Sequence, residues 1–341
     1  MSASFVVLGH TLLFHYADEL QRVAPFRDVL KGGQTAVGDL VFNIAIRIAT
    51  RLPEIGVNIF FVISGYLITS LLLEEERTRG VVSIKAFYVR RMFRILPAFW
   101  VYLLTIFALR TAGVLEAPAG AFVRSAFFMC NIPDACDAWF LAHTWSLSFE
   151  EQFYLVWPFA FVALGARRGH GLVALLLALT LASFWFRAAT SFALIACGAL
   201  YAVSARARAW VAVPVAWHGV PVAALLLVAA PFFASAPAIL MALDVARPVL
   251  TSILFFGSLA GVGPFVSALN STLAARLGLA SYSIYLWQQI STGDPKLFHG
   301  GAPPIVIFVA PALASYFLIE KPFIRIGHRL SARILARTPP R

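Results

Sequence analysis

Ionisable side chains are rare inside the apolar segments of this sequence, so the few that occur there are the first candidates for chemistry. His10 lies within the first apolar segment, and Glu150 and Glu151 head the fourth, in HTWSLSFEEQFYLVWP. An imidazole titrates near neutral pH, so His10 could take a proton from a hydroxyl and return it to a leaving group. A carboxylate aimed at that imidazole would fix its tautomer and stabilise the imidazolium. These residues predict a general acid–base site.

Structural roles for the same residues stay open. A neutral histidine can hydrogen-bond between helices, and adjacent glutamates can cap or anchor a helix at the aqueous boundary. Neighbouring side chains on a helix point about 100° apart, so two adjacent carboxylates cannot both face lipid cheaply. At least one of Glu150 and Glu151 should therefore face the protein interior.

A basic pair forms the second candidate group. In SIKAFYVRRMFRILPAFW, Arg91 and Arg94 are three residues apart and share a helix face, which suits the binding of phosphate groups. Anchoring of the helix beside anionic lipid explains the same cluster, so both readings remain.

Polar and aromatic side chains within apolar segments form a third group. They could line an acceptor pocket, although close helix packing is their usual role, as for Gly65 in GVNIFFVISGYLITSLLL. The pocket candidates are Asn58, Ser64, Tyr154, Tyr282, Tyr285 and Trp287. No metal site and no bound cofactor are expected. Cys130 and Cys136 share a polar loop, where their spacing permits a disulfide without requiring one.

Membrane helices must position these residues. The sequence is 60% apolar and 13% charged, with a mean hydropathy of +0.83, values that would leave large apolar patches on a water-soluble domain. A helix of ~20 apolar residues spans the hydrocarbon core, and long apolar runs recur throughout. They lie near 1–16, 53–73, 95–112, 144–165, 172–187, 190–204, 219–234, 248–266, 277–292 and 303–319.

The predicted fold is therefore an all-α integral membrane protein. About ten transmembrane helices form a single domain over residues 1–341, with no separate soluble domain and with a short first helix. The formal net charge of +11 is spread over short loops, which indicates membrane orientation rather than nucleic-acid binding.

Five segments, in this order, resemble signatures of the membrane acyltransferase family 3: GVNIFFVISGYLITSLLLEEE, FYVRRMFRILPAFW, TWSLSFEEQFYLVWP, SYSIYLWQQ and IEKPF. The resemblance implies O-acylation of saccharides of lipopolysaccharide, exopolysaccharide or other glycosides, commonly from acetyl-CoA. It carries the family's first-helix histidine onto His10 and its RxxR element onto Arg91 and Arg94. A basic residue that the family has eleven positions before that histidine would precede Met1.

Together these inferences predict an O-acyltransferase in a bacterial inner membrane. It would transfer an acyl group, commonly acetyl, from a cytoplasmic acyl-CoA to a carbohydrate hydroxyl. His10 is the expected general base, oriented by Glu150 or Glu151, and Arg91 and Arg94 are expected to bind donor phosphates. A transporter or flippase for a glycolipid or small solute is the alternative, for which internal repeats would be the expected sign.

Both termini are expected to be cytoplasmic. With this orientation the cytoplasmic segments hold 17 Lys and Arg residues and the opposite segments hold eight. Reporter fusions after Arg341 check the orientation, since a phosphatase that works only outside the cytoplasm should stay inactive there. An active phosphatase fusion at that position would reverse the topology.

Overall fold

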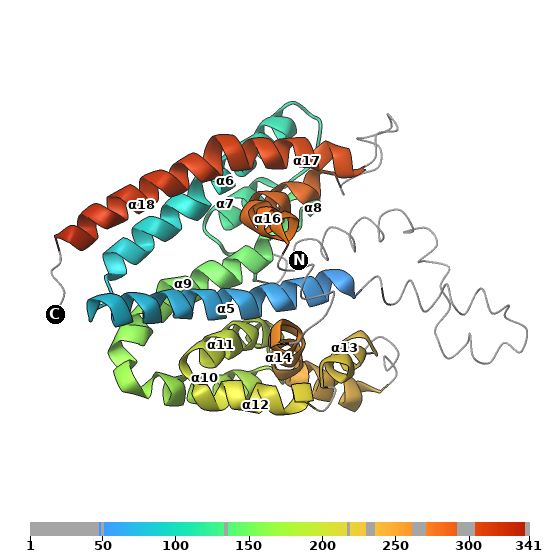
Figure 1. Ribbon diagram of the computed structural model, residues 1–341. Helices are drawn as coiled ribbons and strands as arrows, with labels where there is room; N and C mark the ends of the chain where they lie inside the picture. Colours follow the sequence, from blue (N-terminus) through green and yellow to red (C-terminus); the bar gives the residue numbers. More distant parts are fainter. Residues whose placement is uncertain are drawn as a thin grey trace, which may run out of the picture. The chain divides into compact units, whose positions relative to one another are not determined.

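The structure, a computed structural model, describes residues 48, 51–132, 136–216, 219–229, 236–260, 271–291 and 304–337 (Figure 1). His10 and His15 lie outside the described residues. All regular elements within the described ranges are helices, which confirms the all-α fold class.

Several of these helices have the length and composition of membrane spans. Within the described ranges, four helical segments are both long enough and apolar enough to cross a membrane: Leu52–Arg79, Ile84–Thr111, Trp139–Ala182 and Pro237–Leu259. A fifth is added if Ala188–Val203 and Ala205–Val211, which meet at a bend of 111°, form one span. The membrane character of the chain is confirmed, and the total of about ten transmembrane helices stays a prediction.

Tertiary contacts divide the chain into two compact units, which are described one at a time. Residues 1–65 and 175–270 form the first unit, and residues 66–174 and 271–341 form the second. The unit boundaries fall within two helices, α5 (Leu52–Arg79) and α10 (Arg168–Ala182). This division does not test the predicted single domain.

The first unit contains the start of α5, the end of α10 and four further helices. These are α11 (Ala188–Val203), α12 (Ala205–Ala216), α13 (Gly219–Ala229) and α14 (Pro237–Ala260). The apolar segment predicted over 248–266 starts too late, because α14 already begins at Pro237. Proline suits the first turn of a helix, where its missing N–H is not needed. Pro214 lies inside α12.

Gly65 allows α5 to approach α11 closely. A Cβ atom at this position would lie 1.8 Å from the carbonyl oxygen of Ile195 and 3.1 Å from the backbone nitrogen of Ala199. Only a residue without a side chain fits such a backbone contact. The packing role predicted for Gly65 is thus confirmed, and Ser64 beside it is also buried.

The second unit contains the remaining part of α5 and the segments that carry most of the candidate site. Its elements are α6 (Ile84–Thr111), α7 (Ala119–Ala126), α8 (Trp139–Ala142), α9 (Thr144–Leu164), η1 (Gly165–Arg167), the start of α10, α16 (Thr272–Ser291), α17 (Pro304–Ser315), the π-helical turn η4 (Tyr316–Glu320) and α18 (Lys321–Ala336).

The last helix, α18, lies along α6 (Figure 1). Gly327 leaves room for the side chain of Phe93, since a Cβ at residue 327 would lie 2.7 Å from the Phe93 Cβ. Arg90 of α6 donates to Ser331 Oγ of α18 at 2.8 Å and to Glu75 of α5 at 2.6 Å. These contacts fix the register of α18 on α6, and with it the position of the turn that precedes α18.

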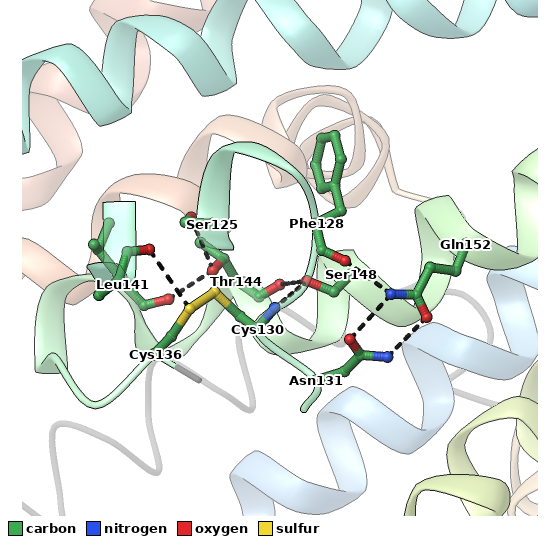
Figure 2. Close-up of a disulfide and its surroundings, with 10 residues drawn as sticks. Ser125, Phe128, Cys130, Asn131, Cys136, Leu141, Thr144, Ser148 and Gln152 are labelled. Atoms are coloured by element: carbon green, nitrogen blue, oxygen red, sulfur yellow. Dashed lines mark hydrogen bonds between the residues drawn. A yellow bond between two sulfur atoms is a disulfide. The ribbon is translucent and has the colours of Figure 1, made fainter. Parts of the chain in front are cut away.

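A disulfide-closed loop is attached to α9 (Figure 2). Cys130 and Cys136 are bonded with their Cα atoms 5.2 Å apart, which answers the question that their spacing left open. The Cys130 N–H donates to Ser148 Oγ at 3.1 Å, and the side-chain amides of Asn131 and Gln152 exchange hydrogen bonds of 2.8 and 3.0 Å. One side of α9 is thereby held by the loop.

Replacing Gly65 with alanine should destabilise the protein by about 1–3 kcal/mol, because the added methyl group overlaps the backbone of α11. Thermal unfolding of the purified protein in detergent measures the loss. Gly278→Ala is the matched control, since Gly278 is also helical but a Cβ there meets nothing within 4 Å. That control should stabilise α16 by up to about 1 kcal/mol. Equal melting temperatures for the two variants would contradict the close contact.

Candidate active site

A buried ion-pair cluster joins α6 to α9. One guanidinium nitrogen of Arg91 donates to Glu150 at 2.8 Å and to Glu151 at 3.3 Å. The guanidinium also lies 3.8 Å from the ring centroid of Tyr154, whose hydroxyl donates to Glu150. The structure therefore brings together Arg91, Glu150, Glu151 and Tyr154. From the sequence, Arg91 was expected to bind the donor, the two glutamates to act in catalysis and Tyr154 to line the acceptor pocket.

Helix geometry explains how adjacent glutamates reach the same partner. Glu150 and Glu151 point about 100° apart, and Arg91 lies between these directions. Glu150 is 5% exposed and the side chain of Glu151 is 17% exposed, so both face protein, as expected for carboxylates in an apolar helix. Tyr154 follows Glu150 by four residues and so shares its helix face.

Among the described residues of the cluster, one guanidinium faces two carboxylates. Because buried ions are costly unless they are compensated, this ratio favours the approach of a further cation or of a proton. The cluster is therefore suited to stabilising a positive charge that forms nearby, such as an imidazolium.

The polar side chains of α16 approach the same helices. Tyr282 donates to the backbone oxygen of Ile95 at 3.1 Å, and its phenol lies within electrostatic range of Glu150 and Glu151. One turn along α16, the Tyr285 hydroxyl donates to the His143 carbonyl at 2.9 Å and is hydrogen-bonded to Ser146 Oγ at 2.5 Å. Two of the predicted pocket residues thus contact α6 and the start of α9.

The other predicted residues are placed elsewhere. Arg94 is exposed on α6, whereas Trp287 is buried and packs edge-on against Tyr102, with ring centroids 5.5 Å apart. Asn58 and Ser64 belong to the first unit, where Asn58 lines a small cavity together with Arg247. His10 lies outside the described residues, so its relation to the glutamates stays a prediction.

Two buried polar residues were missed from the sequence. His143 is 4% exposed, with its ring edge-on to Tyr102 and Tyr285 at centroid distances of 5.4 and 5.6 Å. Glu320 is fully buried at the end of η4 and accepts a hydrogen bond from Ser283 at 2.8 Å. Each lies one residue beyond a predicted apolar segment, 144–165 or 303–319, so a boundary set one residue wider would have included it.

No group of three or more His, Cys, Asp or Glu side chains that could hold a metal ion occurs in the parts of the chain that the structure describes.

The two arginines of the RxxR element should behave differently. Arg91→Ala leaves two buried carboxylates without their shared guanidinium and should cost about 3–5 kcal/mol of stability. Arg94→Ala removes an exposed side chain and should change stability by less than about 0.5 kcal/mol. Thermal unfolding of both purified variants checks this contrast. A fully stable Arg91→Ala protein would mean that the ion pairs do not hold α6 to α9.

Known proteins resemble parts of this chain in sequence. A family model described as an acyltransferase domain matches residues 1–324. The peptidoglycan O-acetyltransferase OatA of Listeria monocytogenes serovar 1/2a is 34% identical over 123 residues, which are 30% of this chain and 19% of OatA. YrhL of Bacillus subtilis (strain 168), whose name assigns it the same activity provisionally, is 36% identical over 123 residues, 30% of this chain and 18% of YrhL.

The matched part of the chain thus spans about a fifth of the length of these curated relatives. No solved structure matches the chain. The family match, by contrast, extends over nearly the whole sequence and agrees with the resemblance carried by its motifs. Since that match runs from residue 1 to residue 324, the chain belongs to the membrane acyltransferase family 3.

Proposed function

We propose that this protein transfers an acetyl group from cytoplasmic acetyl-CoA to a hydroxyl of an envelope saccharide, within a bacterial inner membrane. The observation that carries the proposal is the family match over residues 1–324, a range that includes the buried cluster of Arg91, Glu150 and Glu151. An enzyme of this kind must supply charges and a proton acceptor inside the membrane, and the cluster supplies the charges.

The chemistry requires little beyond positioning and proton transfer, because a thioester is already activated. The acceptor hydroxyl oxygen attacks the thioester carbonyl carbon while its proton passes to a base, for which His10 is proposed. The carbon–sulfur bond then breaks, the acyl group remains on the acceptor oxygen, and the thiolate leaves with the coenzyme and takes up the proton. Glu150 or Glu151 would orient the imidazole and stabilise its charged form.

The geometry supports different roles for Arg91 and Arg94. Arg91 is engaged by two carboxylates and by the ring of Tyr154, so its main effect is on the acidic residues. Arg94 is exposed on the same helix, and its guanidinium suits the diphosphate of the donor. Donor binding is therefore assigned first to Arg94.

The disulfide supports the proposed sidedness. Such bonds form and persist in oxidising compartments, so the disulfide favours an orientation in which the loop with Cys130 and Cys136 faces the outside of the membrane. That orientation puts both termini, and the start of α6 with its basic residues, on the cytoplasmic side where acetyl-CoA is made.

The name of a relative indicates which acceptor to test first. The OatA name describes a peptidoglycan O-acetyltransferase, so peptidoglycan is the first acceptor to test, followed by lipopolysaccharide and exopolysaccharide. Mass spectrometry of each glycan, from cells with and without the gene, would identify the acylated molecule and the acyl group together. Unchanged glycans under expressing conditions would favour transport of a glycolipid or small solute.

His10→Gln should remain membrane-inserted and lose acetyl transfer by a factor of about 10²–10⁴, since an amide hydrogen-bonds but does not act as a base at neutral pH. Transfer of label from acetyl-CoA to the identified glycan measures the loss, and the melting temperature of the variant shows whether it is folded. A folded His10→Gln protein as active as the parent would make His10 structural and leave the family assignment intact.

A further inference from the structure

Glu320, in the IEKPF motif, is a buried carboxylate that the proposed mechanism has not used. It is 0% exposed, and one carboxylate oxygen, Oε2, accepts the Ser283 hydroxyl at 2.8 Å. Within the described part of the chain, the other oxygen, Oε1, is buried and has no hydrogen-bond partner. A buried acceptor left in this state is costly, and more so when it is charged, so the site is built for a donor that it lacks.

The local backbone is also unusual. Glu320 ends the π-helical turn η4, Tyr316–Glu320, which lies between α17 and α18. A π-helical turn interrupts the regular hydrogen-bond ladder, and such turns occur frequently at functional sites. Contacts of α6 with α18 and with η4 itself hold this turn in place.

The neighbours of Glu320 combine both signs of charge. The positive charge of Arg94 acts on the Glu320 carboxylate, and the phenol of Tyr282 lies within electrostatic range of it. Arg94 is exposed and Glu320 is buried, so the pair joins the surface of this unit to its interior. A ligand that contacts both needs an anionic part for Arg94 and an N–H or O–H donor for Glu320.

We infer that Glu320 binds the pantetheine arm of the donor, through Oε1 accepting an amide N–H or the hydroxyl of that arm. The inference rests on the proposed acetyl-CoA-dependent function. Coenzyme A carries a diphosphate followed by an arm with one hydroxyl and two amide N–H groups, which is the order of groups that Arg94 and Glu320 require. Phosphate itself is excluded as the partner of Oε1, because it would repel the carboxylate.

Donor truncation tests the assignment. Affinities of the purified, membrane-reconstituted full-length protein are measured by calorimetry for coenzyme A and for pantetheine, which has the arm but lacks the phosphates. Glu320→Gln should weaken both ligands by about tenfold or more, because a charge-assisted hydrogen bond is lost from each. Arg94→Ala should weaken coenzyme A and leave pantetheine unchanged. A Glu320→Gln protein with parental affinity for both ligands overturns the inference.

A matched buried carboxylate controls for folding. Both oxygens of Glu75 are occupied, by the Ser83 N–H at 2.8 Å and by Arg90 at 2.6 Å. Glu75→Gln should therefore lower the melting temperature without changing either affinity, whereas Glu320→Gln should weaken both ligands and melt like the parent. A Glu320→Gln protein that melts early, and whose folded fraction binds both ligands as tightly as the parent, would make Glu320 structural.

Acetyl transfer, assayed on the same preparations, separates the inference from the proposed function. A parent protein that binds coenzyme A but acylates no glycan would count against the function and leave the Glu320 assignment standing on its affinities. An active parent whose Glu320→Gln variant raises the KM for the glycan alone would overturn the inference and keep the function.

Discussion

The pairing of Arg91 with Glu150 and Glu151 is the constraint on which the second unit depends. Charged groups in an apolar environment are tolerated only when they compensate one another, so α6 and α9 must meet where these side chains can reach. Tyr154 adds two further contacts, with its ring over the guanidinium and its hydroxyl donating to Glu150. An arrangement chosen for stability alone would not need three ions here, since apolar side chains of similar volume would pack at lower cost.

Helix α9 is held on two sides by different kinds of contact. Ser148 and Gln152 bind the disulfide loop, whereas Glu150 and Tyr154 bind Arg91. A helix fixed in this way can neither rotate nor slide without breaking one of the two sets. The hydrogen bonds to the loop and the buried ion pairs are different kinds of contact. Together they determine a single position for Glu150 and Glu151 on α9.

Much of this arrangement could be predicted from the sequence, for identifiable reasons. Long apolar runs identified the helices, and the cost of a charge in hydrocarbon identified Glu150 and Glu151 as inward-facing. Spacing along the chain could not show that Arg91 meets them, because 59 residues separate Arg91 from Glu150 and only tertiary packing joins the two. Glu320 and His143 were missed because hydropathy places helix ends only to within a few residues. His10 lies outside the described residues, so its part in the site stays a prediction.

The disulfide loop also makes the maturation of the protein depend on its surroundings. Since only six positions separate Cys130 from Cys136, closing so short a loop contributes about 2 kcal/mol through chain entropy. It also acts locally, because the bond holds the Cys130 N–H and the Asn131 amide against α9 (Figure 2). Formation of the bond requires a thiol oxidant, so the full set of contacts between this loop and α9 depends on the redox state of the loop's surroundings.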